Sequence, residues 1–307
     1  MTGFPPLHKM TKEGNKPGKE AAGNPRGVTM IHCLATIFSL FVVFWAVAPE
    51  PFAQERKKQI GERFGGEDVQ YEAGFWVFPA VGAGGAHFYA LGNDRFFLNH
   101  EGRAQGLAGW VTRNRKEIHR AWMGTAEQGS RLIPLRLEEE SVIGEWVRRK
   151  ITQYDYSARK VLMETVKDGE VSRETAEIPP GVYYDNPMTA FYNFRYGVYG
   201  EVAPGREFII RTVPRKGQGV FRVAVAPENE AARIRGEESE KKGKDLLVRV
   251  FLEQEFLGSP KGQIEIWFDK ELNPVSGMVR KVKYLGDIRG RITQFAYLPA
   301  VQHPRVP

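Results

Sequence analysis

Leu246-Leu247-Val248-Arg249-Val250-Phe251-Leu252 is the segment that shows most clearly how this chain folds. Every second residue, from Leu246 to Leu252, is apolar and falls on one side of an extended chain, with Arg249 on the other. The segment Gln263-Ile264-Glu265-Ile266-Trp267-Phe268 repeats the pattern. A period of two residues is typical of half-buried β-strands, so both segments predict strands.

The same period recurs between residues 67 and 300, for example at Ile133, Leu135 and Leu137. Turn sequences such as Gly92-Asn93-Asp94 and Lys167-Asp168-Gly169-Glu170 separate the apolar runs at short spacing. Consecutive strands joined by tight turns predict antiparallel hairpins, and a long meander of hairpins protects its edges by curling. We therefore expect an all-β fold, an antiparallel half-open β-barrel.

One segment follows helical rather than strand spacing. Asp185-Asn186-Pro187 supplies an N-cap side chain followed by a proline at the first helical position, and Gly197 is a suitable stop. Between them, Met188, Phe191, Tyr192 and Arg195 recur at helical spacing. We expect this short helix to plug one opening of the barrel, with Phe191 in the core. A mobile lid over a ligand cavity is the alternative.

The N-terminal region predicts export from the cytoplasm. Residues Val28 to Ala48 contain no Asp, Glu, Lys or Arg, and five basic residues precede them. An apolar run of this length can cross a bilayer as one hydrophobic helix, and the preceding basic residues stay in the cytoplasm. We therefore expect a bacterial periplasmic protein, and whether the run is a cleaved signal peptide or a retained inner-membrane anchor stays open.

These features predict five regions along the chain. They are a disordered basic tail at 1–27, the signal peptide or anchor at 28–48, a linker at 49–66, the exported β domain at 67–300 and a short tail at 301–307. Membrane association through residues 28–48 follows if that segment is not cleaved.

Composition excludes several classes of site. Cys33 is the only cysteine and lies in the apolar run, so the β domain has no disulfide, thiolate metal site or cysteine nucleophile. The net charge of +7 is spread among many acids rather than clustered, which argues against nucleic acid as a partner. We expect neither a metal nor a cofactor.

The search for catalytic motifs is also negative. No metalloprotease, nucleophile-elbow or phosphate-loop pattern occurs, and the glycine-rich segment Gly82–Ala86 is interpreted as a hairpin turn. His87, His100, His119 and His303 are not at close metal-ligand spacing and are interpreted as surface or satisfied strand residues. The acidic runs Glu138–Glu140 and Glu237–Glu240 are interpreted as solvated loops. We therefore expect no enzyme and no catalytic residues.

Two features indicate a binding function. The segment Gly106-Leu107-Ala108-Gly109-Trp110-Val111 is followed by basic residues that include Arg113 and Arg115. An apolar loop tipped with Trp110 and backed by cations suits a membrane surface or an amphiphile with an anionic head group. The alternative is that Trp110 packs into the end of the barrel.

The second feature is a supply of aromatic residues that could line a curved sheet and hold an apolar ligand, although small barrels fill their interiors with the same residues. We include Phe191 and Trp267 with Trp110, Arg113 and Arg115 as the expected ligand contacts.

Four segments, taken in order, carry a resemblance to a known family: Tyr71–Val77, Gly106–Lys116, Pro179–Tyr192 and Lys261–Asp269. Over residues 67 to 300 the chain resembles the bacterial exported domain-of-unknown-function family 3108. The resemblance implies an envelope β protein similar in architecture to the open barrels of periplasmic lipoprotein carriers, with no known catalytic residues. The chain departs from that pattern in its N-terminal tail and in the insertion near 228–244, where added helices are compatible with it.

The sequence thus predicts non-enzymatic binding of a hydrophobic or amphipathic envelope component, a lipid or other amphiphile. The alternative is a structural or assembly factor that pairs with an envelope protein through an exposed sheet edge. A hydrolase ranks third, because the motif search is empty.

Overall fold

The computed structural model describes residues 58–75, 78–215, 218–237, 241–251, 263–282 and 286–299. The predicted tails at 1–27 and 301–307 and the apolar segment at 28–48 lie outside the described residues. Within the described ranges, no helix combines the length and the apolar character that a membrane span requires.

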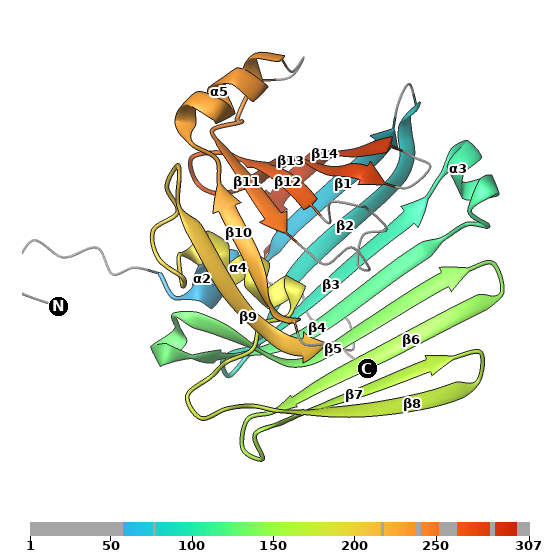
Figure 1. Ribbon diagram of the computed structural model, residues 1–307, viewed down its shortest axis with the longest axis vertical. Helices are drawn as coiled ribbons and strands as arrows, with labels where there is room; N and C mark the ends of the chain where they lie inside the picture. The colour runs from blue at the N-terminus through green and yellow to red at the C-terminus, as the bar shows by residue number, and fades with distance from the viewer. Residues whose placement is uncertain are drawn as a thin grey trace, which may run out of the picture. The chain divides into compact units, whose positions relative to one another are not determined.

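The described residues form one antiparallel sheet of fourteen strands with a few short helices (Figure 1). In chain order the elements are α2 (Ile60–Phe64), β1 (Glu67–Phe75), β2 (Phe78–Gly92), β3 (Arg95–Ala104), α3 (Gly106–Val111), β4 (Lys116–Ala126), the 3₁₀ turn η1 (Glu127–Gly129), β5 (Arg131–Ile143), β6 (Trp146–Asp155), β7 (Lys160–Lys167), β8 (Glu170–Glu177), α4 (Pro187–Tyr196), β9 (Glu207–Arg215), β10 (Gln218–Val225), α5 (Glu228–Glu237), β11 (Leu246–Phe251), β12 (Gln263–Phe268), β13 (Pro274–Val282) and β14 (Gly286–Tyr297).

The sheet consists of two meanders joined at their first and last strands. Strands β1 to β8 pair in sequence, strands β9 to β14 do the same, and β1 pairs with β14. The end strands β8 and β9 do not pair, so the barrel is nearly closed but open along one side. This arrangement confirms the predicted all-β, half-open antiparallel barrel.

The open side is bridged by the segment between β8 and α4. Ile178 and Tyr184 from this segment are buried in a cluster with Tyr154 and Val161 of the first meander and Val213 of β9. The backbone N–H of Asp185 also donates to the carbonyl oxygen of Arg211, 2.8 Å away. These contacts hold the two end strands on either side of α4.

Helix α4 begins and ends as its sequence predicts. The Asn186 side-chain oxygen accepts hydrogen bonds from the backbone N–H groups of Met188 and Thr189, both at 2.9 Å. Gly197 ends the helix in the left-handed conformation, with φ of 84°. Because N-cap acceptors satisfy otherwise unpaired N–H groups, the cap fixes where the helix starts.

Helix α4 fills one end of the barrel, enclosed with α2 between the two meanders (Figure 1). Tyr192 and Tyr196 pack with α2 and the inner face of β2–β5, whereas Ala190 and Phe194 pack with β9–β12. Phe191 lies between these two clusters, and its ring contacts those of Tyr192 and Phe268. The predicted plug, with Phe191 in the core, is confirmed.

A buried ion pair fixes α4 to the wall of the barrel. The side chains of Arg195 and Glu67 are both fully buried, and their two N–H···O contacts measure 2.7 and 2.8 Å. Arg195 also donates to the carbonyl oxygen of Leu272 at 2.7 Å. Its guanidinium lies 4.7 Å from the centre of the Phe64 ring. The pair therefore links α4 to α2, to β1 and to the turn before β13.

A second polar cluster fixes α4 to β5. The Asn193 side chain donates to the carbonyl oxygen of Leu132 and accepts from its N–H group, at 2.9 and 2.8 Å. It also donates to buried Asp185, which is ion-paired with Arg131 at 2.6 Å. Because β6 pairs only with Arg136–Ile143 of β5, Asn193 satisfies backbone groups that β6 leaves unpaired.

Three sequence predictions are wrong in detail. Residues 58–66 are not linker, because Ile60 and Phe64 of α2 are fully buried in the core. Ile133 does not share the inner face with Leu137, since a register shift between β4 and β5 turns Leu132 inward instead. Glu138–Glu140 are not a solvated loop, because they lie within β5.

Replacing Glu67 with glutamine should destabilise the fold by about 3 kcal/mol, because it leaves the Arg195 charge buried without a carboxylate. Denaturant unfolding of the purified protein measures the change. Glu164→Gln is the matched control, since the Arg173–Glu164 pair has a similar 2.8 Å contact but is exposed. The control should lose no more than about 0.5 kcal/mol, and equal losses in the two variants would contradict the role given to the buried pair.

Candidate functional site

The end of the barrel away from α4 carries an exposed apolar helix. Helix α3 joins β3 to β4 and projects at this end (Figure 1). Trp110 is 79% exposed and Val111 is 66% exposed. On the opposite side of the helix, a side chain at Gly109 would come within 3.3 Å of the carbonyl oxygen of Ala104. The glycine therefore allows α3 to pack against its own hairpin and turns Trp110 outward, which rules out packing into the barrel end.

Other apolar side chains are exposed at the same end. Phe78 at the start of β2, Val147 at the start of β6 and Val171 at the start of β8 are 42%, 45% and 51% exposed. Each lies beside a hairpin that turns at the α3 end of the sheet (Figure 1). We call these three residues with Trp110 and Val111 the hairpin rim.

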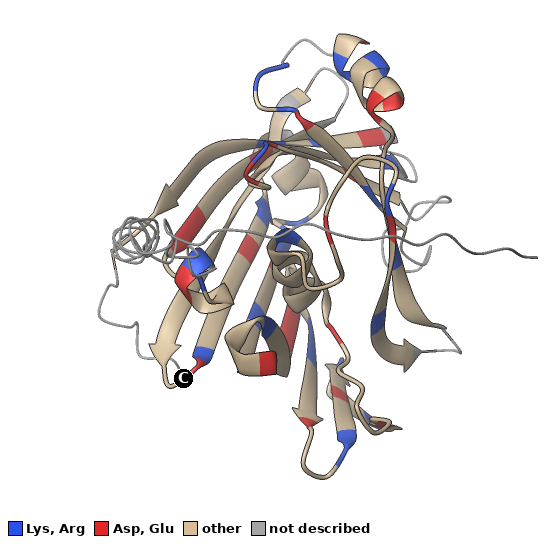
Figure 2. Ribbon diagram, turned by 90° about the vertical axis from the view of Figure 1, so that its left-hand side faces the viewer, with Lys and Arg blue, Asp and Glu red and all other residues tan. Residues whose placement is uncertain are grey.

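The two predicted arginines lie beside α3 but differ in their partners. Arg115 is ion-paired with Glu117 at 2.7 Å. Arg113 is exposed, and its carbonyl oxygen accepts from the N–H group of Gly144 in the β5–β6 turn. Glu117 compensates the charge of Arg115. Only Arg113 therefore still supports the expected preference for an anionic head group. Acidic and basic residues are interspersed over the described domain as a whole (Figure 2).

The structure does not bring Trp267 together with the other predicted contacts. Trp267 is 4% exposed and packs with Leu247, Ala231 and Ile234, beneath α5. Its neighbour Phe268 points inward instead, to Phe191 and Phe194 of α4. Strand alternation explains the correction, because successive side chains face opposite sides of a sheet. Trp267 therefore belongs to the outer face, and Phe191 to the core.

The inner face of the first meander changes from apolar to polar along its strands. Close to α4, Phe88, Leu98, Ala121 and Leu137 are buried in the core. Two residues further toward the hairpin rim, His100, His119, Glu139 and Lys150 lie opposite one another on β3, β4, β5 and β6. Residues directly opposite in antiparallel strands share a face, so this set also points inward. With Tyr71 of β1 we call it the inner polar row.

Hydrogen bonds connect the first three residues of the row. The Tyr71 hydroxyl lies 2.8 Å from Nε2 of His100, and Nδ1 of His100 lies 3.2 Å from Nδ1 of His119. The two imidazole rings are nearly parallel, at an interplanar angle of 9°. The sequence predicts only surface or satisfied strand histidines here, because the pairing of His100 with His119 depends on strand register rather than on spacing along the chain.

Glycines make room for this chain of hydrogen bonds. Gly84 lies opposite Tyr71, and a side chain there would collide with the tyrosine hydroxyl. The corresponding approach at Gly102 is 3.2 Å. The interpretation of Gly82–Ala86 as a hairpin turn is wrong, because these residues lie within β2. Their small size allows Tyr71 to lie across the sheet and reach His100.

Burial keeps His100 and Tyr71 uncharged at neutral pH. Burial, and then the neighbouring His119, lowers the pKa of His100 from 6.5 to about 4, against an opposing effect of Glu101. Burial likewise raises the pKa of Tyr71 to about 12. Both residues are therefore neutral between these values, and each can donate and accept hydrogen bonds.

The row ends in a partly satisfied ion pair. Lys150 Nζ lies 3.4 Å from Oε2 of Glu139, and the two side chains are 11% and 30% exposed. The Glu139 Oε2 atom is itself buried and accepts no hydrogen bond in the described part of the chain. A buried acceptor without a donor is uncommon in a native protein and is often associated with function.

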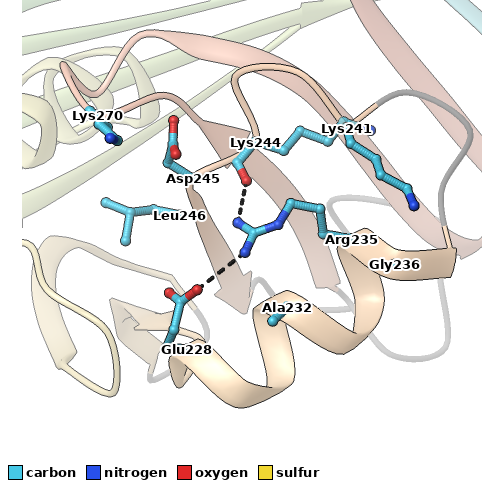
Figure 3. Close-up of a pocket in the computed structure, with 9 residues that line it drawn as sticks. All are labelled: Glu228, Ala232, Arg235, Gly236, Lys241, Lys244, Asp245, Leu246 and Lys270. Atoms are coloured by element: carbon cyan, nitrogen blue, oxygen red, sulfur yellow. Dashed lines mark hydrogen bonds and ion pairs between the residues drawn. The ribbon is translucent and has the colours of Figure 1, made fainter.

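A metal site and the pocket beside α5 are less well supported as ligand-binding sites. Within the described ranges, no group of three or more His, Cys, Asp or Glu residues is arranged to hold a metal ion. A surface pocket beside α5 is lined by several basic side chains (Figure 3). Its central cation, Arg235, donates to the carbonyl oxygen of Lys244 and to the carboxylate of Glu228. Arg235 therefore serves to attach α5 to the loop before β11.

Comparison with known proteins adds a family and a structural likeness. A family model described as a protein of unknown function (DUF3108) matches residues 82–293, from β2 to β14. Among solved structures, the chain is similar to a β-barrel-like protein of the domain of unknown function DUF1849 from Brucella abortus. The identity is 9% and the TM-score 0.44, and the match covers 76% of this chain and 98% of the other. No curated protein matches the sequence.

The lowered pKa of His100 predicts a pH dependence of stability. Below pH 6.5 the His100 ring binds a proton in the unfolded state but not in the folded state. The free energy of unfolding should therefore decrease as the pH is lowered from 6.5 to 4. The slope from this residue should approach about 1 kcal/mol per pH unit. Denaturant unfolding at several pH values measures it, and His100→Gln should remove that part of the slope. Tyr71→Phe keeps the titrating ring and should retain the slope; an unchanged slope in His100→Gln would contradict the assignment.

Proposed function

This chain belongs to the DUF3108 family, whose function is unknown, and we propose that it binds a hydrophobic or amphipathic component of the bacterial envelope without catalysing a reaction. The observation that supports this most is the exposure of Trp110 and Val111 on α3, at 79% and 66%. Together with the rest of the hairpin rim, they place apolar side chains at one end of the barrel. Exposed apolar groupings rimmed by polar residues are typical of interaction sites.

The filled core restricts where such a molecule binds. Helix α4 occupies the apolar half of the interior, through Phe191 and Tyr192. The apolar part of a ligand therefore contacts the hairpin rim, where Trp110 offers a large rigid surface. Its polar part meets the inner polar row, whose side chains are only partly buried.

The arrangement of polar groups favours binding over catalysis. Activation of a hydroxyl or thiol nucleophile requires a base held in place by a third group. In the inner polar row the only hydroxyl is that of Tyr71, and burial raises its pKa to about 12. Raising the pKa makes the phenolate harder to form, which is the opposite of activation.

A second candidate is pairing with a protein partner through a sheet edge. It is favoured by β8, which ends the sheet and has no paired strand on one side in the described structure. This strand is rich in exposed charges, with Glu170, Arg173, Glu174 and Glu177 among its eight residues. Because charged edge strands hinder further pairing, we place this candidate second.

The proposed location is the periplasm. It is supported by the uncharged run Val28–Ala48 and the basic residues before it. An envelope ligand and an exported binding domain are consistent with each other. If residues 28–48 are not cleaved, they attach the domain to the inner membrane.

Trp110→Ala should weaken binding of a single-chain amphiphile about tenfold, because it removes the largest exposed contact surface. Calorimetric titration with dodecyl maltoside and with dodecyl phosphate, below micelle formation, measures affinity. The free energy of unfolding should change by less than about 0.5 kcal/mol, since the indole is mostly exposed.

Ile209→Ala is the matched control for that variant, because Ile209 is 60% exposed but lies on β9, away from α3. It should bind as the wild type does. Absence of saturable binding to any amphiphile, or unfolding caused by Trp110→Ala, would refute the proposed function.

Export is tested by fusing alkaline phosphatase after Pro307. The enzyme folds actively only outside the cytoplasm, where its disulfides form, so the fusion should be active. Deleting residues 1–48 should abolish that activity while the fusion protein is still made. An inactive full-length fusion at normal abundance would exclude export.

A further inference from the structure

The hydrogen-bonded chain in the inner polar row can run in either direction. In one arrangement, the Tyr71 hydroxyl donates to Nε2 of His100, and Nδ1–H of His100 donates to Nδ1 of His119. His119 then carries its proton on Nε2, and this N–H group can donate to a ligand. In the reverse arrangement all the donors and acceptors exchange, and Nε2 of His119 accepts. A neutral imidazole has one donor and one acceptor nitrogen, so the two arrangements use the same atoms.

The outer end of this chain is Nε2 of His119, which has no hydrogen-bond partner among the described residues. Directly opposite on β5 is Glu139, whose buried Oε2 accepts no hydrogen bond there. Lys150 follows on β6 at 3.4 Å from that oxygen. The inner face therefore carries, side by side, a nitrogen that can donate or accept, a carboxylate oxygen with an ion pair but no hydrogen bond, and the ammonium group of that ion pair.

We propose that the inner polar row is the binding site for an uncharged, hydroxyl-bearing head group, of the sugar or glycerol type, with Nε2 of His119 and Oε2 of Glu139 as its contacts. This inference rests on the proposed function and names the ligand class. A hydroxyl group both donates and accepts, so it matches either arrangement of the chain and can donate to the carboxylate oxygen that accepts no hydrogen bond.

The charges of the row disfavour other head groups. Glu139 and Lys150 carry opposite charges and compensate each other. An anionic head group would face the Glu139 carboxylate, and a cationic one the Lys150 ammonium. Neutrality of His100 at physiological pH adds no charge that could balance either of them. A partly buried site binds an unmatched charge poorly, because the charge loses its hydration.

The strip between the row and the hairpin rim has no side chains at two positions. Gly84 and Gly102 lie opposite each other on β2 and β3, two residues from Ala86 and His100. Tyr71 occupies the space that side chains there would need, so its ring lies between the row and the hairpin rim. Phe78 of the rim begins β2, and α3 with Trp110 follows β3, so the alkyl chain of an amphiphile would extend along these two strands.

The test compares three amphiphiles that share a dodecyl chain: dodecyl maltoside, dodecyl phosphate and dodecyltrimethylammonium. Each is titrated into the purified full-length protein below micelle formation. Dodecyl maltoside should bind at least about tenfold more tightly than the two charged compounds. Equal affinities, or a preference for either charged compound, would overturn the inference.

His119→Phe preserves the ring shape and removes Nε2, so affinity for dodecyl maltoside should fall about tenfold, the loss of one hydrogen bond. Glu139→Gln should act in the same direction. His87→Gln is the matched control, because His87 lies on the opposite face, paired with Asp68, and should leave binding unchanged. Wild-type affinity in a folded His119→Phe variant would overturn the inference.

Nitrogen NMR of the histidine rings gives a readout that does not depend on a variant folding. Maltoside binding should shift the ring nitrogens of His119 and His100 together, because they belong to one hydrogen-bonded chain. Maltose without the alkyl chain should produce the same shifts at higher concentration. If no dodecyl compound binds but maltose shifts these nitrogens, the proposed function fails and the head-group site stands; absence of any shift with maltose and maltoside overturns the site.

Discussion

The buried ion pair between Arg195 and Glu67 is the interaction on which the rest of the barrel depends. Apolar contacts hold α4 inside the sheet but have no direction, whereas a bidentate arginine–carboxylate pair fixes one rotation and one depth of the helix. The pair has no exposed surface, and the rings of Phe64 and Phe191 lie close to the guanidinium. An unbalanced charge in that position would be costly, so both partners must be present for either to be tolerated.

The position of α4 divides the interior into two chemical zones. On its side, the aromatic residues of α4 join one apolar cluster with β2–β5 and another with β9–β12, which closes that end of the barrel. On the other side, the same strands of the first meander carry the inner polar row and end at the hairpin rim. Among the described residues, the polar side chains of the inner face and the exposed apolar residues of α3 therefore both lie on the side away from α4, and they follow one another along the β3–α3–β4 hairpin.

Most of the fold is predictable from local patterns, whereas the site is not. The two-residue period predicts the strands, and the Asn186 cap with Gly197 predicts α4 to the residue. The bulge that turns Leu132 inward has no signature in the alternation, and the burial of α2 depends on packing from distant strands. The alternation along β12 already predicts that Trp267 and Phe268 face opposite sides of the sheet. Trp267 is nevertheless predicted as a ligand contact, because aromatic residues are expected to line the interior. The pairing of His100 with His119 follows only from register, which long-range contacts decide.

The cost of the inner polar row argues that it serves more than folding. Two residues closer to α4, the same face of the sheet carries Phe88, Leu98, Ala121 and Leu137, so the sheet does not require polar side chains on this face. Yet two residues away Glu139 holds a buried oxygen that has an ion pair but no hydrogen bond, and Gly84 gives up strand propensity so that Tyr71 can reach His100. The unbonded oxygen and the glycine both destabilise the strands that carry them, and both lie in or next to the inner polar row. Departures from local stability that converge in this way are typical of a binding site, because the missing partner is supplied by the ligand.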